Sequence, residues 1–182
     1  MEENQKEKDS WGDLLRFGIL ILLVVIPFRI FIAQPYLVEG ASMDPTFKDG
    51  DYLIVDQVSY RFKNPARGSV IIFKYPKDPS KDFIKRVVGL PGETISIRNG
   101  GVFIKNESGE IKLEEPYIKF PKYDDLEITL KESEYFVMGD NRAGSSDSRY
   151  WGPLPKKDIV GRPLFRLLPI NSLDAFPGDR SQ

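Results

Sequence analysis

The sequence predicts a mainly β domain behind a single N-terminal transmembrane helix, and three observations support this fold class. An apolar segment lies near the N-terminus, short runs rich in β-branched and aromatic residues follow it, and Gly, Pro and Asn turn signals separate those runs. No helical periodicity of convincing length follows the apolar segment. At 182 residues, the chain is long enough for one domain with its own core.

The apolar segment covers residues 14–36 and carries no charge over residues 17–28. A helix over residues 14–33 reaches the roughly 20 residues that a bilayer span needs, provided that Arg16 and Arg29 extend to the lipid headgroups. We therefore predict a single-pass membrane anchor over residues 14–33.

A buried core helix and a cleaved secretory signal are the alternatives for this segment. Gln34-Pro35 makes a poor processing site, which favours an uncleaved anchor. Slightly more Lys and Arg residues precede the span than follow it, so residues 1–13 are predicted to be a short cytoplasmic segment.

Six runs after the anchor have the composition of β-strands. They cover residues 51–60, 68–75, 82–90, 93–97, 102–106 and 134–140. The sequence RNGG after the fourth run predicts a tight hairpin, because Asn and Gly tolerate the positive φ of such turns. The sequence NESGE predicts a second hairpin after the fifth run.

The segment over residues 91–132 is more polar and richer in lysine than the segments on either side. We predict that it forms a small inserted β subdomain, while residues 34–90 and 133–170 together form the main β core. Residues 171–182 are predicted to be an irregular tail.

The composition excludes several classes of function. The formal net charge of −1 gives no support to a nucleic-acid partner, which usually requires a basic surface. The absence of cysteine excludes disulfides, thiolate nucleophiles and thiolate metal sites. The absence of histidine removes the commonest general base and metal ligand. A carboxylate-only metal site stays possible by composition, but residues 140–147 fail the calcium-loop pattern because Arg142 stands where an acid is needed.

The stretch VEGASMDPTF, residues 38–47, places Ser42 between small residues and a proline turn. This serine is either an exposed nucleophile or a turn residue, and serines in Gly- and Pro-rich turns are more often the latter. A serine hydroxyl becomes an effective nucleophile only when a base removes its proton. In a chain without histidine, that base has to be another kind of side chain.

The stretch DFIKRVVG, residues 82–89, supplies a candidate base. Side chains alternate along a strand, so Lys85 and Arg86 point to opposite faces, each among apolar neighbours. Burial can lower a lysine pKa by up to about 3–5 units, which would make Lys85 a neutral amine that accepts a proton. Arg86 is excluded as a base because its guanidinium stays protonated. The alternative is an edge-strand lysine that points to solvent.

The stretch GDNRAGSSDSRYWGPLP, residues 139–155, is dense in Gly, Asp, Asn and Ser. It is either a surface loop held by hydrogen bonds from side chains to backbone, or a supporting loop for the site. In the second interpretation a hydroxyl orients the amine and an Asp–Arg pair holds the loop in place. The composition alone does not decide between them.

Taken together, the three stretches resemble a known family. In order, GASMDPT, RGSVIIF with IKRVVGLPGE, and GDNRAGSSDSRYWG resemble the conserved boxes of type I signal peptidases, the Ser–Lys proteases that remove signal peptides from exported proteins. The resemblance extends from about residue 35 to residue 169. The lone anchor and the short insertion are similar to the compact bacterial forms.

The resemblance implies roles for individual residues. Ser42 matches the nucleophile, Lys85 the general base, and Ser145 the serine that hydrogen-bonds and orients the lysine amine. The other matched positions support the loop: Asp147 and Arg149 as an ion pair, and Asp140 and Arg142 as structural residues.

The family's oxyanion hole uses the backbone N–H of the nucleophile and a donor two residues earlier, here Ser42 and Gly40. Gly40 has no side-chain hydroxyl, so a backbone donor, a water or no second donor are the options. Met43, which follows the nucleophile, and Ile84, which precedes the base, are candidate residues of the substrate pocket.

The resemblance also implies a fold and a function. The implied fold has two antiparallel β-sheet regions, the smaller inserted into a catalytic core that lies outside the cytoplasm. The implied reaction cleaves preproteins after small residues, in an Ala-X-Ala pattern, through an acyl-enzyme. The implied partners are signal-peptide-bearing preproteins, the lipid bilayer and the protein export machinery, with no nucleic acid, no metal and no cofactor.

Two other functions share some of these features. A self-cleaving protease of the SOS-repressor type has the same Ser–Lys dyad and core fold, but it needs an N-terminal DNA-binding domain where this chain has its predicted anchor. A catalytically silent, membrane-anchored β scaffold would have no need of both Ser42 and Lys85.

Overall fold

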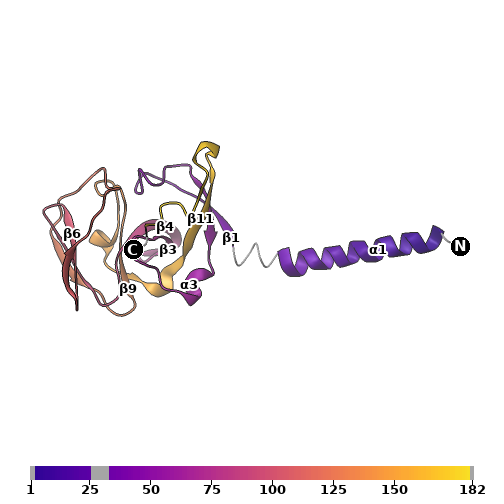
Figure 1. Cartoon of the computed structure of the whole chain (residues 1–182), viewed down its shortest axis with the longest axis horizontal. Helices are drawn as coiled ribbons and strands as arrows, with labels where there is room; N and C mark the ends of the chain where they lie inside the picture. The colour runs from indigo at the N-terminus through magenta and orange to yellow at the C-terminus, as the bar shows by residue number, and fades with distance from the viewer. Residues whose placement is uncertain (1–2, 26–32, 181–182) are drawn as a thin grey trace.

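The structure is a computed structural model of the chain and describes residues 3–25 and 33–180. Helix α1, Glu3–Leu20, continues into the π-helical turn η1, Ile21–Val25. Figure 1 shows α1 extending away from a β body that is formed by the rest of the chain.

The predicted anchor over residues 14–33 is only partly covered by this description. Within the described ranges, no helix is both long enough and apolar enough to cross a bilayer. Residues 26–32 of the predicted anchor lie outside the described residues, and its last residue, Ala33, is the first residue of a strand.

The β body contains two antiparallel sheets, which confirms the mainly β fold class. In the larger sheet the strand order is β1-β2-β11-β3-β4-β9-β10, and β12 pairs with β11. Its strands are β1 (Ala33–Leu37), β2 (Tyr52–Asp56), β3 (Val70–Tyr75), β4 (Asp78–Gly89), β9 (Glu134–Met138), β10 (Leu154–Pro155), β11 (Ile159–Leu168) and β12 (Asp174–Ala175).

The smaller sheet has the order β7-β6-β5-β8. Its strands are β5 (Thr94–Arg98), β6 (Gly101–Asn106), β7 (Gly109–Lys112) and β8 (Leu126–Thr129). All four lie inside the range 91–132 that the sequence predicts as an insertion. In Figure 1 this sheet, marked by β6, lies at the end of the body opposite β1.

Every predicted run contains a strand, but the first is shorter than predicted. Strand β2 ends at Asp56, and helix α3, Ser59–Phe62, follows. The cause is local: the Asp56 carboxylate accepts hydrogen bonds from the backbone N–H groups of Val58 and Ser59 at 2.9 and 3.0 Å, which turns the chain.

The sequence prediction missed β11, and the tail that it predicts as irregular contains one two-residue strand, β12. Gly161 and Pro163 weigh against a strand by composition, yet register shifts on both sides of β11 accommodate them. Strand β12 pairs with β11 through Phe165 and Arg166. The other short elements are α4 (Ser148–Trp151), η2 (Lys156–Asp158) and η3 (Ile170–Ser172).

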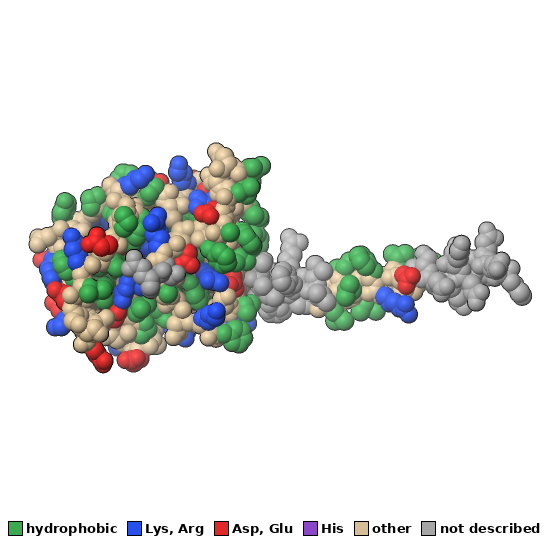
Figure 2. All heavy atoms as spheres, viewed as in Figure 1, with side chains coloured by type: hydrophobic (Ala, Val, Ile, Leu, Met, Phe, Trp, Pro, Cys, Tyr) green, Lys and Arg blue, Asp and Glu red, His purple; other side chains and the backbone are tan. Residues whose placement is uncertain are grey.

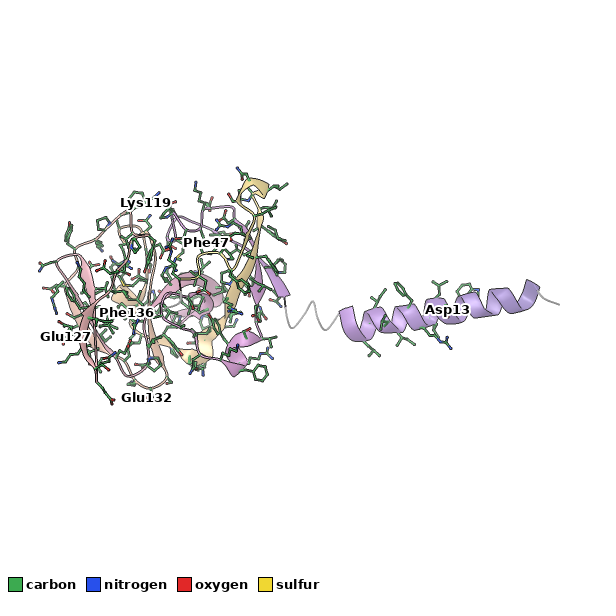
Figure 3. The ribbon with its side chains drawn as sticks, viewed as in Figure 1. Asp13, Phe47, Lys119, Glu127, Glu132 and Phe136 are labelled. Atoms are coloured by element: carbon green, nitrogen blue, oxygen red, sulfur yellow. The ribbon has the colours of Figure 1, made fainter. Side chains whose placement is uncertain are left out.

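Apolar side chains from both sheets hold the body together. Phe136 of β9 belongs to a buried cluster that joins β4 and β9 to β5 and β6 of the smaller sheet. A second cluster surrounds Phe47, and a third surrounds Phe73 of β3. Figure 3 shows Phe47 and Phe136 inside the body and Glu127 and Glu132 at its edge.

Strand β4 runs between these clusters with alternating side chains. Ile84 packs against the Phe47 cluster, whereas Phe83 and Val87 pack in the Phe73 cluster. The two cations between them, Lys85 and Arg86, are therefore both carried into the interior.

Candidate active site

Ser42 lies in the turn between β1 and β2. Gly40 has a φ of +84° there, in the left-handed region that glycine enters without strain. Backbone hydrogen bonds from Gly50 N–H to the Val38 carbonyl and from Phe47 N–H to the Met43 carbonyl hold the turn. Ser42 is therefore presented by a turn that is fixed at several points.

The Lys85 amine lies against the Ser42 hydroxyl. Nζ of Lys85 is 2.7 Å from Ser42 Oγ, and it donates a hydrogen bond of 2.8 Å to the Ile84 carbonyl. The Lys85 side chain comes from the middle of β4, and the residue is only 4% exposed. The structure thus brings together the two residues that the sequence predicts as nucleophile and base.

The surroundings of Lys85 favour its neutral form. Burial lowers the pKa of the Lys85 amine from 10.5 to about 8, while the negative charges of Asp147 and Asp140 act in the opposite direction. The effect of burial is the largest, so a substantial fraction of the amine is unprotonated in mildly alkaline solution. A neutral amine at hydrogen-bond distance from a hydroxyl can act as its general base.

Asp147 and Arg149 form the ion pair that the resemblance implies. Arg149 Nε donates to Asp147 Oδ1 at 2.8 Å, and Asp147 has no exposed side-chain surface. The other oxygen of Asp147 accepts the Gly139 N–H at 3.0 Å. The pair therefore closes the loop from residue 139 to residue 149 on itself.

Asp140 is paired with Arg86, and this contact was not predicted. Arg86 Nε and Nη2 donate to the two oxygens of Asp140 at 2.9 and 2.6 Å, and both side chains are fully buried. Thr46 Oγ1 also donates to Asp140, at 2.5 Å. From the sequence, Arg86 is considered only as an alternative to Lys85 for the general base. A cation on a buried strand face nevertheless requires a buried carboxylate as its partner.

Ser145 does not make the expected hydrogen bond to Lys85. Its Oγ is buried and has no hydrogen-bond partner among the residues that the structure describes. It lies beside Gly139, where an added Cβ would come within 2.2 Å of Ser145 Oγ and 2.4 Å of the Ser42 carbonyl oxygen. Gly139 thus allows the loop, the Ser42 turn and Ser145 to approach closely.

Asn141 is a further site residue that sequence reasoning missed. Its backbone N–H donates to the Ser42 carbonyl at 3.0 Å, and its side-chain amide donates to the Ala41 carbonyl at 3.1 Å. The position of Asn141 directly after Asp140 gave no signal of this contact, because the two segments are about a hundred residues apart in the sequence.

The dyad opens into a cleft of about 460 Å³. The cleft runs between the end of β1, residues 36–39, and the outer part of β4, residues 81–85, and Leu53 and Ile72 contribute to its lining. Its volume is in the range of ordinary ligand sites, about 300–1,000 Å³.

The two pocket candidates have different outcomes. Ile84 lines the cleft beside Lys85. Met43 is not part of the cleft lining, because its side chain turns into the Phe47 cluster and is only 1% exposed. Met43, the residue after Ser42, thus anchors the turn in the core.

Gly40 is not free to bind a substrate oxygen in this geometry. Its backbone N–H donates to Asp49 Oδ1 at 2.7 Å. The Ser42 N–H has no hydrogen-bond acceptor within the described part of the chain. Of the two oxyanion positions that the sequence predicts, only Ser42 therefore offers an open donor.

The described residues include no group of three or more acidic side chains placed to hold a metal ion. The lining of the cleft includes both Ser42 and Lys85.

Comparison with known proteins gives consistent matches. Residues 11–168 match the family model described as signal peptidase, peptidase S26. A probable signal peptidase I-1 from Synechocystis sp. (strain PCC 6803) is 38% identical over 160 residues, which cover 84% of this chain and 80% of that protein. Signal peptidase I V of Bacillus subtilis (strain 168) is 36% identical over 159 residues, which cover 79% of this chain and 91% of that protein.

A crystal structure of a signal peptidase I from Enterococcus faecalis V583 aligns with 55% of this chain and 97% of its own, at 30% identity and a TM-score of 0.49. The family model covers far more than half of the chain, and it includes Ser42, Lys85 and the loop around Asp147. The chain therefore belongs to the signal peptidase family, peptidase S26.

Proposed function

We propose that this chain is a serine endopeptidase that removes signal peptides from exported preproteins, with Ser42 as nucleophile and Lys85 as general base. The observation that carries the assignment of residues is the 2.7 Å contact between Ser42 Oγ and a buried Lys85 amine whose pKa is lowered to about 8. Membership of the signal peptidase family supports the substrate class.

In the first half of the reaction, neutral Lys85 accepts the Ser42 proton while Oγ attacks the scissile carbonyl. The Ser42 N–H donates to the developing oxyanion, and such a donor typically contributes about 2.7–4 kcal/mol. The tetrahedral intermediate collapses to an ester, and the Lys85 ammonium protonates the departing amine of the mature protein.

In the second half, Lys85 accepts a proton from the water that attacks the acyl-enzyme ester. The ester bond breaks, the proton returns to Ser42 Oγ, and the signal peptide leaves with a new carboxylate. Both halves use the same amine, so one lowered pKa serves acylation and deacylation.

The cleft supports an extended peptide as substrate. β1 is an edge strand of the larger sheet, and its end lines the cleft opposite β4. An extended chain can add to such an edge through backbone hydrogen bonds, while side-chain pockets select alternate residues. The apolar lining from Ile84, Leu53 and Ile72 fits small side chains in an Ala-X-Ala pattern.

The proposal includes a membrane anchor over residues 14–33, with a cytoplasmic N-terminus and a catalytic body outside the cytoplasm. Its support is the sequence of that segment and the described part of α1, whose exposed side chains include Leu14, Leu15 and Phe17. Figure 2 shows mainly hydrophobic side chains there, and the exposed Asp13 and Arg16 are paired at 3.5 Å.

Anchoring would make the bilayer and the export machinery partners of the enzyme. Enzyme and preprotein on one membrane have a raised effective concentration. The division into a catalytic core, 34–90 and 133–170, an insertion, 91–132, and a tail, 171–182, is part of the same proposal.

The test is cleavage of a preprotein with an Ala-X-Ala site by the full chain in detergent. Ser42→Ala and Lys85→Ala should each abolish cleavage while the circular dichroism spectrum and Tm show a folded protein. Ser108→Ala and Lys105→Ala make the same substitutions at exposed positions of the smaller sheet and should cleave normally.

Normal turnover by folded Ser42→Ala or Lys85→Ala would overturn the dyad. Complete inactivity of the wild-type chain on every Ala-X-Ala preprotein would favour the catalytically silent scaffold instead.

A further inference from the structure

The segment between β7 and β8, residues 113–125, lies against the loop that carries the supporting residues of the dyad, residues 139–149. We refer to these as the 113–125 segment and the 139–149 loop. The segment belongs to the range predicted as an insertion, for which the proposed reaction has no role. Figure 3 places one of its residues, Lys119, at the outer edge of the body.

The first contact between them is an ion pair from Glu115 to Arg142. Arg142 Nη1 donates to Glu115 Oε2 at 2.9 Å, and Nη2 donates to the other carboxylate oxygen. Arg142 Nε donates in turn to the Gly139 carbonyl at 3.1 Å. Glu115 and Arg142 are nearly inaccessible to solvent, which makes their charges strong partners and costly to leave unpaired.

The second contact runs from Asp124 to Arg149. Arg149 Nη1 donates to Asp124 Oδ2 at 2.7 Å, while Arg149 Nη2 donates to the Arg142 carbonyl at 2.7 Å and Nε to Asp147. Asp147 holds the Gly139 N–H. Both ion pairs are therefore linked to the backbone of Gly139. The first is linked through Arg142 to the Gly139 carbonyl, and the second through Arg149 and Asp147 to the Gly139 N–H.

Gly139 is the residue through which the two ion pairs can affect the position of Ser42. The space for a Cβ at Gly139 is already filled by Ser145 Oγ and the Ser42 carbonyl oxygen. The next residue, Asp140, accepts a hydrogen bond from Arg86, and the N–H of Asn141 donates to the Ser42 carbonyl. A shift of Gly139 therefore displaces the Ser42 turn together with Asp140 and Asp147, the two carboxylates whose charges act on Lys85.

One further contact joins the segment to the loop, and another joins the segment to Arg86 of β4. The Ala143 N–H donates to the Phe120 carbonyl at 3.2 Å. The Tyr117 ring lies 4.4 Å from the Arg86 guanidinium carbon, and its hydroxyl donates to Glu115 at 2.9 Å. The 113–125 segment thus contacts the 139–149 loop at its beginning, middle and end.

We infer that Glu115 and Asp124 are positioning residues for the peptidase reaction, which hold the 139–149 loop against Ser42 and Lys85 through Arg142 and Arg149. This inference rests on the proposed function of the Ser42–Lys85 dyad. It gives the smaller sheet a positioning role, because the connection between its strands β7 and β8 carries the two carboxylates that fix the loop.

The test compares Glu115→Gln and Asp124→Asn with wild type, as full chains in detergent, on one Ala-X-Ala peptide. We expect kcat to fall on the order of 10- to 100-fold, because small displacements at a catalytic site have effects of this size, while KM changes little. The matched control is Glu110→Gln. Its pair with Arg98, at 2.7 Å, is in the same subdomain, but both side chains are 42% exposed. The control should retain wild-type kcat.

The pH–rate profile separates positioning from simple stabilisation. A displaced loop admits water to the Lys85 amine, so the acidic limb of the variants should move above its wild-type position near pH 8. The carboxylates whose charges act on that amine, Asp140 and Asp147, are present in every variant. Asp124→Glu keeps the charge and should restore most of kcat.

Variants that have a lower Tm but wild-type kcat and an unmoved acidic limb would overturn the inference. If Glu115→Gln does not fold, the kinetics of Asp124→Asn test the inference. The Asp124 side chain is 24% exposed, so removing its charge should destabilise the fold less. Activity in a parallel Ser42→Ala sample would refute the proposed Ser42–Lys85 dyad, on which this inference rests. Inactive Ser42→Ala beside wild-type kinetics in both carboxylate variants would refute the positioning role alone.

Discussion

At the scale of single residues, the site depends on what burial does to one lysine. An exposed lysine is protonated near neutral pH and cannot take a proton from a serine. The strand β4 carries Lys85 into the interior, where its amine loses solvent and meets the Ser42 hydroxyl. The carboxylates of Asp140 and Asp147 oppose this effect, but each is paired with an arginine.

The first prediction concerns the pH dependence of cleavage. Only the neutral amine can accept the Ser42 proton, and the folded protein releases the Lys85 proton near pH 8 instead of 10.5. Activity should therefore be low below this pH and rise through about pH 8 to a plateau. Single-turnover acylation rates, measured with one peptide across the pH range, check the position of the limb.

A limb near the ordinary lysine pKa of about 10.4 would contradict this prediction, because it would mean that water reaches the amine. Ser42→Ala serves as the blank at every pH, since it retains the amine but lacks the nucleophile.

At the scale of elements, two segments distant in sequence meet through buried charges. Arg86 of β4 and Asp140, which follows β9, are fully buried and bonded through both carboxylate oxygens. Arg86 also donates to the carbonyls of Gly68 and Gly178 at 2.6 and 2.5 Å. One guanidinium thus joins its own strand to three other segments of the chain, one of them in the C-terminal tail.

The second prediction follows from this pairing. Asp140→Asn leaves the Arg86 charge buried without its counter-ion, so it should lower the free energy of unfolding by about 3–5 kcal/mol. Urea unfolding at pH 7 measures the change. Asp78→Asn is the matched control, because its ion pair with Lys81 at 3.0 Å is exposed and should matter little.

A loss in Asp140→Asn no larger than that in Asp78→Asn would show that the buried pair is not needed for stability.

The sequence predicts much of β4 and the contact of Lys85 with Ser42, but not the ion pairs around the site. Alternation along residues 82–90 put Lys85 and Arg86 on opposite faces, and chemistry distinguished them. The partner of Arg86 is 54 residues away, and that of Glu115 is 27 residues away. Such pairings depend on how the strands are ordered, which local composition does not encode.

Three further features of the site could not be predicted from the sequence. Met43 turns into the core, the Gly40 N–H binds Asp49, and Ser145 Oγ does not reach Lys85. Each depends on the direction in which one side chain or one backbone N–H points within a turn or loop. A motif fixes which residues are present, whereas these directions are set by packing.

At the scale of the whole molecule, α1 lies apart from the β body in Figure 1. The two sheets share one buried cluster around Phe136, so the smaller sheet is packed onto the larger one. The exposed apolar side chains of α1 have no such cover from the body.

The third prediction tests the proposed anchor. Leu20→Arg puts a charge inside the apolar part of residues 14–33, and a charge at the centre of a membrane helix costs about 2.5–3.5 kcal/mol. Less of the full chain should therefore sediment with membranes after carbonate extraction. Phe62→Arg, at an exposed position of α3 outside the predicted span, is the control and should leave the membrane fraction unchanged.

Equal membrane fractions for Leu20→Arg, Phe62→Arg and wild type would argue against an anchor that depends on this segment.

The position of β11 in the larger sheet has a consequence for the order of synthesis. This late strand lies between β2 and β3, so it separates the hairpin that carries Ser42 from the hairpin that carries Lys85. A growing chain has made both residues long before Ile159–Leu168 is available to join the two hairpins into one sheet. The sheet pairing that joins the Ser42 hairpin to the Lys85 hairpin therefore cannot form until residues 159–168 have been synthesised.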